Sequence, residues 1–177
     1  MSIKGNKKEA DFQTEIKRGI DHYISRTGDR CLYHKISDES RDRKPYDFFK
    51  FNKLGAFAVE LKSVKAKDVC NLRSMFRDRE HQPIALRRSH YPEVYNYGAI
   101  VINHYYKPDR INNCYVLPIN IYDNILSNYG TMRFSEIPEN FKVPKIARQI
   151  PFSARTEKVW DIVAMLNIII NNSSCQD

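Results

Sequence analysis

The chain has 177 residues, of which 42% are hydrophobic and 28% are charged. This length is too short for two ordinary domains, and the composition is typical of an ordered globular protein rather than a disordered or fibrous one. We therefore expect one domain over residues 1–177 with its own hydrophobic core.

The cysteines and the N-terminal sequence suggest where the protein resides. The four cysteines form no C-x-x-C pair and no regular spacing, which argues against a disulfide framework and a zinc knuckle. The first residues contain no apolar signal segment, and no apolar run is long enough for a membrane span. We expect a cytoplasmic protein with reduced thiols and no membrane contact.

The net charge is +8, and its distribution is uneven. Residues 1–90 contain 21 Lys and Arg against 13 Asp and Glu, whereas residues 91–177 contain 8 of each. A one-sided basic surface is typical of a protein that binds a polyanion, because each neutralised phosphate releases condensed counterions. The alternative is a bias that only favours solubility.

The first predicted element is an amphipathic helix from about Lys8 to Arg26. Phe12, Ile16, Ile20 and Tyr23 follow one another at helical spacing, and Gly28 is a typical residue just after a helix end. Glu15 lies on the margin of this apolar stripe. Its carboxylate could face either water or a neighbouring cleft.

A strand and a β-hairpin are expected next. Residues 31–36 have strand character, and a polar loop follows that ends at Pro45. Residues 46–52 and 55–64 are rich in aromatic and β-branched residues and are separated by a short turn, which predicts a hairpin.

The middle of the chain predicts two short basic helices followed by two strands. Residues 68–76 could form the first helical piece, and Pro83 suits the first turn of a second one that begins near His81 and Gln82. Residues 99–106 are a strong candidate for a central strand, and residues 113–119 predict another.

The last third predicts a helix, an irregular stretch and a terminal helix. Residues 121–130 form a short helical pattern that ends at Gly130, and prolines interrupt residues 131–154. Residues 155–170 carry an apolar stripe of helical period. The element order indicates an α/β domain with a central mixed sheet flanked by helices, although an α+β arrangement also fits.

The second strand of the hairpin carries charges on one face. Side chains alternate between the two faces of a strand. Ala58, Glu60 and Lys62 therefore share one face, and the apolar residues Phe57, Val59 and Leu61 share the other. A lone charge in a half-buried sheet is costly, and a partner charge or a metal ion offsets that cost. Asp47, 13 positions before Glu60, is expected to reach the same face across the hairpin.

Two carboxylates and a lysine suit metal-assisted phosphodiester hydrolysis. Mg²⁺ prefers carboxylate oxygens and keeps several waters, one of which can act as the nucleophile. A lysine can orient that water or stabilise the developing charge.

The motifs P-Y-D at 45–47 and E-L-K at 60–62 resemble the signature of the PD-(D/E)xK nucleases, with Tyr46 as a departure because Asp47 follows Pro45 by two positions. Within that superfamily the chain is most similar to the RecU-type Holliday junction resolvases. The similarity covers about residues 8–150 and includes the helix with Glu15, the His81–Gln82 pair and the strand segments 98–106 and 115–119.

This resemblance implies a restriction-endonuclease-like core and a set of site residues. Asp47, Glu60 and the carbonyl of Leu61 would bind Mg²⁺, for which Mn²⁺ would substitute, and Lys62 would orient the attacking water. Glu15 would complete the acidic cluster, and Gln82 would lie beside the site. The resemblance also implies a homodimer that acts on branched DNA without an organic cofactor.

Each of these assignments has a structural alternative. The E-x-K triplet is also common as an ion pair in sheets, and Glu15 could simply pair with Lys17 or Arg18. Gln82 could be a helix N-cap. Three acidic residues of the polar loop could supply the second carboxylate instead of Asp47: Asp38, Glu39 and Asp42.

Basic residues directly follow the E-x-K strand, where a surface that contacts phosphates is expected. They should hold the DNA backbone rather than read bases. The predicted DNA-binding residues are Lys65, Lys67, Arg73, Arg77, Arg79, Arg87 and Arg88. The leading hypothesis is a Mg²⁺-dependent endonuclease that resolves four-way junctions. The alternatives are another PD-(D/E)xK nuclease, of restriction or repair type, and a non-catalytic DNA-binding protein.

Overall fold

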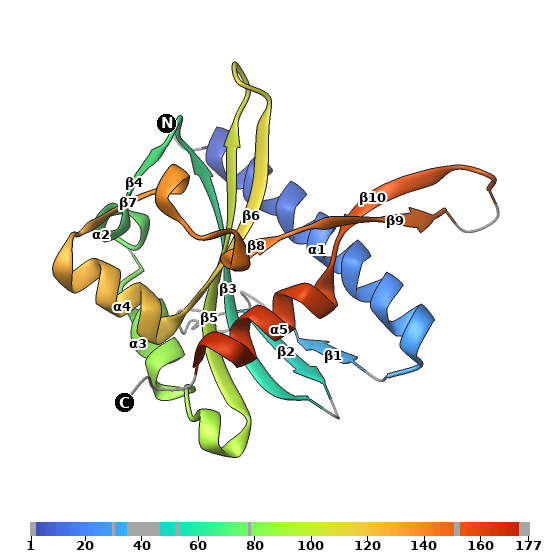
Figure 1. Ribbon diagram of the computed structural model, residues 1–177, viewed down its shortest axis with the longest axis horizontal. Coiled ribbons are helices and arrows are strands. Elements are labelled where there is room, and N and C mark those ends of the chain that lie inside the picture. The colour runs from blue at the N-terminus through green and yellow to red at the C-terminus, as the bar shows by residue number, and fades with distance from the viewer. Residues whose placement is uncertain are drawn as a thin grey trace.

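A mixed six-stranded sheet forms the centre of the molecule (Figure 1). The computed structural model describes residues 3–29, 31–34, 47–51, 54–77, 79–150 and 153–173. The sheet has the order β1-β2-β3-β5-β6-β8, and helices cover both of its faces. The prediction of an α/β chain with a central mixed sheet flanked by helices is confirmed.

The strands of this sheet follow the predicted hairpin and central strands closely. Their bounds are β1 Cys31–His34, β2 Asp47–Phe51, β3 Gly55–Lys65, β5 Asn96–Tyr106, β6 Ile111–Pro118 and β8 Lys142–Val143. β3 pairs antiparallel with β2 and parallel with β5, and the remaining pairs are antiparallel. The parallel pair requires a long crossover, and the segment with the two short helices provides it.

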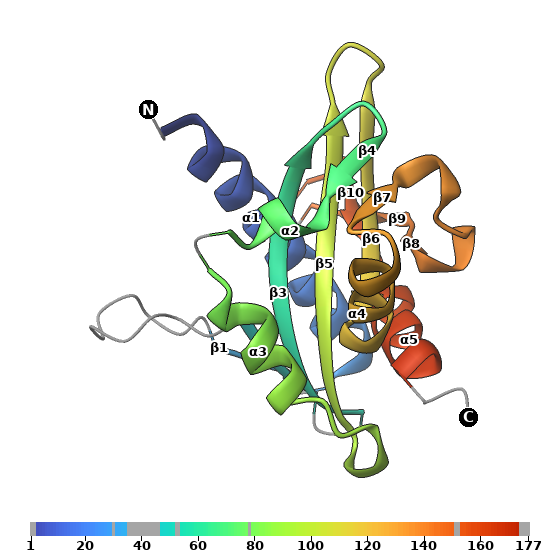
Figure 2. The ribbon, with the colours of Figure 1, turned by 90° about the vertical axis from the view of Figure 1, so that its left-hand side faces the viewer.

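Two pairs of helices cover the two faces of the sheet (Figure 2). α1 (Ile3–Thr27) and α5 (Ile162–Ser173) lie on one face, and α3 (His81–Arg88) and α4 (Ile119–Asn128) lie on the other. α1 begins earlier than predicted and ends as expected, with Gly28 at a φ of +68° after the last turn.

Each face of the sheet therefore has its own hydrophobic core. The α1 core includes Phe12, Ile16 and Trp160 together with Phe57, Val59 and Leu61 of β3. The α3 core includes Leu72, Phe76, Leu86, Tyr122 and Phe134 together with Ala58 of β3. The face of β3 that carries Glu60 and Lys62, expected to be half-buried, is almost completely buried beneath the α3 core.

Two further antiparallel strand pairs lie outside the central sheet. β4 (Val69–Asn71) pairs with β7 (Thr131–Arg133), and β9 (Lys145–Gln149) pairs with β10 (Thr156–Trp160). Short 3₁₀ turns lie at Pro92–Val94, Phe134–Glu136 and Glu139–Phe141. The first of these turns leads into β5.

Three predicted elements were wrong in part. Residues 68–76 form β4 and a single turn, α2 (Leu72–Met75), because β7 supplies a partner strand from a distant part of the sequence. The stretch 131–154, expected to be irregular, contains β7, β8 and β9. The terminal helix starts at Ile162, and the preceding residues form β10, since pairing with β9 outweighs their helical pattern.

None of the helices in the described part of the chain is both long and apolar enough to cross a membrane.

Candidate active site

Glu60 and Lys62 lie on β3, where this strand runs parallel to β5 and just beyond the last described pair with β2, Asp47 and Val59. Their side chains are only 3% and 8% exposed, and Glu60 Oε1 lies 2.8 Å from Lys62 Nζ. Strand alternation places both residues on the face of Ala58, as predicted from the sequence, and this face packs into the α3 core. The two charges are therefore removed from water together.

Two further side chains hold the Lys62 ammonium. Lys62 Nζ donates a hydrogen bond of 2.9 Å to Gln82 Oε1, and it lies 4.8 Å from the ring centroid of Phe76. Gln82 is 3% exposed and belongs to the first turn of α3, whose start is held by the hydrogen bond from the Gln82 amide to the Arg79 carbonyl. Gln82 is thus a partner of Lys62, and it is not the N-cap of the helix.

The Lys62 side chain reaches a surface pocket of about 460 Å³, which we call the Lys62 pocket. The ends of β3 and α1, the strand β4 and the turn α2 form its walls. Its charged lining residues are Glu9, Lys62, Lys65, Arg77 and Arg79. Four cations against one carboxylate make this pocket suited to a polyanion such as a DNA backbone.

Glu9 supplies the carboxylate of the pocket from α1. It lies 3.7 Å from Arg79, so this ion pair connects α1 to the segment that leads into α3. The hydroxyl of Ser63 donates a 3.3 Å hydrogen bond to the Lys8 carbonyl, which fixes the same end of α1 against β3. The sequence reasoning missed Glu9, although its spacing of three before Phe12 places it on the apolar stripe of the helix.

Glu15 is engaged elsewhere on α1. Its Oε2 accepts a 2.9 Å hydrogen bond from Trp160 Nε1 and lies 3.5 Å from Lys145 Nζ, so it joins α1 to β9 and β10. Lys145 also lies over the Trp160 ring at 4.1 Å. The structure therefore does not place the predicted catalytic residue Glu15 among the residues of the Lys62 pocket.

Asp47 is the first residue of β2, and its side chain lies outside the described part of the structure. The register pairs Asp47 with Val59 and Phe48 with Ala58. Residues directly opposite in a ladder share a face, so the register places Asp47 on the face of Val59 and not on the face of Glu60, where the sequence prediction had placed it. Residues 35–46, which include Tyr46 and the alternative acids Asp38, Glu39 and Asp42, are outside the described residues.

The predicted DNA-binding residues fall into three groups. Lys65, Arg77 and Arg79 line the Lys62 pocket, whereas Lys67, Arg73 and Arg88 are exposed outside it. Arg87 makes a bidentate pair with Asp123 of α4, at 2.7 and 2.6 Å, which ties α3 to α4. This hydrogen bonding raises the pKa of Arg87 above its ordinary value.

The pocket also contains Cys70, whose chemistry is suppressed. Its side chain is buried, and this burial raises the pKa of the thiol to about 11. A thiol of that pKa stays protonated at neutral pH and is a poor nucleophile or metal ligand. The chemistry of the site therefore depends on carboxylates, amide oxygens and ammonium groups.

The carboxylates described near Lys62 are those of Glu60, which is bonded to it, and Glu9, which lines the same pocket; the carbonyl of Leu61 lies between Glu60 and Lys62 in the chain. Mg²⁺ prefers oxygen ligands of these kinds. Among the side chains described, no three His, Cys, Asp or Glu are grouped closely enough to hold a metal ion. The Asp47 side chain, which the predicted metal site requires, is not among the side chains described.

Comparison with known proteins does not assign the chain. No protein-family model matches it, and no curated protein is significantly similar to it.

Proposed function

We propose that this protein is a metal-dependent DNA endonuclease that acts on branched DNA, with the four-way junction as its substrate. One observation carries the proposal: Lys62, whose ammonium bonds to a buried carboxylate and a buried glutamine, lines a pocket whose charged residues are mostly basic. Buried groups of this kind beside a cleft are typical of functional sites.

The alternative is that Glu60 and Lys62 only stabilise the sheet. Removing two charges from water is expensive, and replacing a buried ion pair with well-packed apolar residues is often neutral or stabilising by about 1–4 kcal/mol. A sheet that needed stability alone would do as well with apolar residues here, as it does at Phe57, Val59 and Leu61 on the other face. The polar face of β3 is better explained by chemistry.

The residues of the site have distinct roles in this proposal. Glu60 and the carbonyl of Leu61 hold the divalent ion, with Glu9 as the carboxylate from α1. Asp47 completes the set in this proposal, which requires its carboxylate to reach past the start of β2 to the Glu60 face. A bound Mg²⁺ would supply an activated water and neutralise charge on the phosphate. Mn²⁺, which accepts the same oxygen ligands, is expected to replace it.

Lys62 stabilises the negative charge that develops at the reacting phosphate. Its ammonium has three protons, of which Glu60 and Gln82 each accept one, so one remains to orient a water or bind a phosphate oxygen. Gln82 and Phe76 restrict the ammonium to one position. Lys65, Arg77 and Arg79 hold the DNA backbone at the mouth of the pocket.

The fold is compatible with a restriction-endonuclease-like core, which we include in the proposal. The E-x-K strand β3 follows an antiparallel β2, and the crossover through α3 leads to the parallel β5. We also propose that the protein acts as a homodimer, because a two-fold enzyme matches the symmetry of a four-way junction.

The test is to incubate the protein with a labelled synthetic four-way junction, with and without Mg²⁺, and to map the cuts on all four strands. We expect Mg²⁺-dependent cuts at symmetric positions and little cutting of a linear duplex of the same sequence. Glu60→Gln should lower the cleavage rate by about 10³-fold or more, because several kcal/mol of metal-based stabilisation are lost.

Asp47→Asn tests the residue whose side chain is not described. It should abolish cleavage while DNA binding without metal stays within about two-fold, since binding rests mainly on phosphate contacts. Absence of any metal-dependent cutting by the wild-type protein, together with junction binding, would support the non-catalytic DNA-binding alternative.

A further inference from the structure

The β9–β10 hairpin forms an arm that extends away from the central sheet (Figure 1). The two strands pair over five residue pairs, from Lys145–Trp160 at the base to Gln149–Thr156 near the far end. The arm leaves the body beside α1, on the side of the sheet opposite to α3. It is separate from the Lys62 pocket, whose walls do not include it.

The arm is a basic element within the electrically neutral half of the sequence. Residues 145–160 contain four cations, Lys145, Arg148, Arg155 and Lys158, against one carboxylate, Glu157. Charge counted over residues 91–177 as a whole does not reveal this segregation. The second half of the sequence therefore also contributes a basic surface, although its net charge is zero.

The single carboxylate of the arm is already compensated by two arginines. Glu157 lies 3.6 Å from Arg18 of α1 and 3.9 Å from Arg148 of β9. Arg148 also donates a 3.0 Å hydrogen bond to the Arg18 carbonyl, which fastens this face of the arm to the helix. This cluster keeps a positive charge after the pairing.

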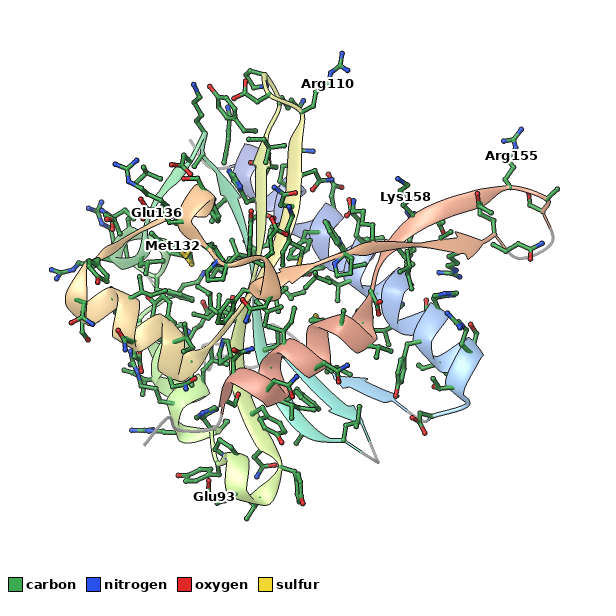
Figure 3. All side chains as sticks on the ribbon, viewed as in Figure 1. Glu93, Arg110, Met132, Glu136, Arg155 and Lys158 are labelled. Carbon is green, nitrogen blue, oxygen red and sulfur yellow. The ribbon has the colours of Figure 1, made fainter. Side chains whose placement is uncertain are left out.

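The other two cations of the arm point into solvent. Figure 3 shows the side chains of Arg155 and Lys158 directed away from the body of the protein. Both residues are exposed, and neither has an ion-pair partner among the residues that the structure describes. A protruding ribbon with exposed, unpaired cations and no exposed large apolar residue in its described strands suits a phosphate backbone rather than an apolar protein surface.

We propose that the β9–β10 arm is a second DNA-contact element that holds the phosphates of a duplex at a distance from the Lys62 pocket. This inference rests on the proposed function, because it assumes that the substrate is DNA. A two-stranded ribbon has the width to lie along a groove of the duplex. With Arg155 and Lys158 as its contacts, the arm binds by charge and adds no base sequence preference.

α1 links the two contact regions. Glu9 lies at the pocket, and Arg18 contacts Glu157 and Arg148 near the far end of the arm; nine residues of helix separate Glu9 from Arg18 by about 13 Å. A duplex that enters the pocket and follows α1 therefore meets the arm within about one helical turn. We expect the arm to bind the phosphates of one duplex branch at a distance from the cleavage position.

The test measures binding of a labelled four-way junction, in buffer without divalent metal, as a function of salt concentration. The variant is Arg155→Gln/Lys158→Gln. We expect its Kd at moderate salt to rise about ten-fold, and the slope of log Kd against log salt to fall by about 2, because two phosphate contacts are lost. A junction whose branches are shortened to less than one helical turn should bind the variant and the wild-type protein equally.

A matched control removes the same charge from the other projecting hairpin. Lys107 and Arg110 are exposed in the turn between β5 and β6, with Asp109 between them, and the Arg110 side chain also points outward (Figure 3). Lys107→Gln/Arg110→Gln has the same net charge as the arm variant. It should leave Kd within about two-fold of the wild type, and the salt slope unchanged, if the arm is a specific contact.

The outcomes separate this inference from the proposed function. Equal losses in the two variants, or no loss in the arm variant, would overturn the arm contact even where the wild-type protein cuts the junction. Wild-type protein that binds junctions through the arm but never cuts them would instead overturn the proposed nuclease and leave the arm contact standing. A circular dichroism melt of both variants shows that each remains folded.

Discussion

The two faces of β3 differ in their effect on the stability of the protein. Phe57, Val59 and Leu61 pack into the α1 core with no exposed surface. Glu60 and Lys62, which alternate with them, are buried almost as deeply in the α3 core but as charges. The same strand thus stabilises the fold with one face and sacrifices some stability with the other, a contrast expected where a site requires ionised groups.

The largest expected effect comes from removing one partner of the buried pair. Lys62→Ala leaves the Glu60 carboxylate without its ammonium, and we expect the free energy of unfolding to fall by about 3–5 kcal/mol. Cleavage should also be lost. On the other face, Ile16→Ala leaves a cavity and should cost about 2–5 kcal/mol.

Urea unfolding measures the free energy of unfolding of both variants. A cleavage assay without urea, at a temperature at which both are folded, compares their activities. The protein with Ile16→Ala should cut the junction at nearly the wild-type rate per folded molecule. Equal loss of cleavage in both variants would mean that the two faces do not differ in function.

The two carboxylates of α1 provide the next comparison. Glu9→Gln should lower the cleavage rate by about 10²–10³-fold, because it removes a proposed carboxylate ligand of the divalent ion. Glu15→Gln should leave the rate within about three-fold and lower stability by less than about 1.5 kcal/mol, since the Glu15 side chain is 38% exposed and its ion-pair partner Lys145 is 24% exposed. The reverse result would restore Glu15 as the site residue.

A smaller effect is expected at Gln82. Gln82→Ala removes the acceptor that fixes the Lys62 ammonium, and misplacement of a catalytic group by about 1 Å can cost up to 10²-fold in rate. We expect a rate loss of about 10–100-fold with nearly normal DNA binding. Ile84→Ala, at an exposed position on the same helix, is the matched control and should change neither quantity.

The smallest expected effect is a loss of stability in mild acid. Burial lowers the pKa values of His90 and His104 below the ordinary 6.5. His90 Nδ1 accepts a hydrogen bond from the Gly98 amide, and the His104 ring stacks on Phe134 at 3.7 Å and bonds to the Ala66 carbonyl. Because the unfolded chain binds these protons more readily, stability falls as the pH drops below 6.5.

Each histidine should contribute up to about 1.4 kcal/mol per pH unit between 6.5 and its folded pKa. Urea unfolding at several pH values measures this slope. His104→Gln keeps a donor for the Ala66 carbonyl but does not titrate, so its slope should be smaller. An identical slope in this variant would show that His104 is not a source of the pH dependence.

Much of the fold was predictable because local signals and tertiary packing agree. The stripe of Phe12, Ile16 and Ile20 predicted α1, and the alternation along Phe57 to Lys62 predicted which side chains share a face. The pairing of Lys62 with Glu60 followed from the same alternation. Gln82 was also predicted to lie beside the site, although its role as an acceptor for Lys62 was not.

The remainder depended on contacts that no local pattern contains. β10 was predicted as helix because its residues continue the apolar period of α5, and only pairing with β9 makes it a strand. Glu15 and Glu9 are both helical carboxylates near the apolar stripe, and the partners Trp160 and Arg79, distant in sequence, determine which one lines the pocket.

The most direct test of the central claim replaces the whole buried polar group at once. The triple variant Glu60→Leu/Lys62→Met/Gln82→Met fills the same space with apolar side chains and leaves none of the three polar partners behind. We predict that its free energy of unfolding equals or exceeds that of the wild type by about 1–4 kcal/mol, while Mg²⁺-dependent cleavage of the four-way junction disappears. A triple variant that still cuts the junction, or one that loses several kcal/mol of stability, would contradict the claim that this face of β3 is kept for chemistry.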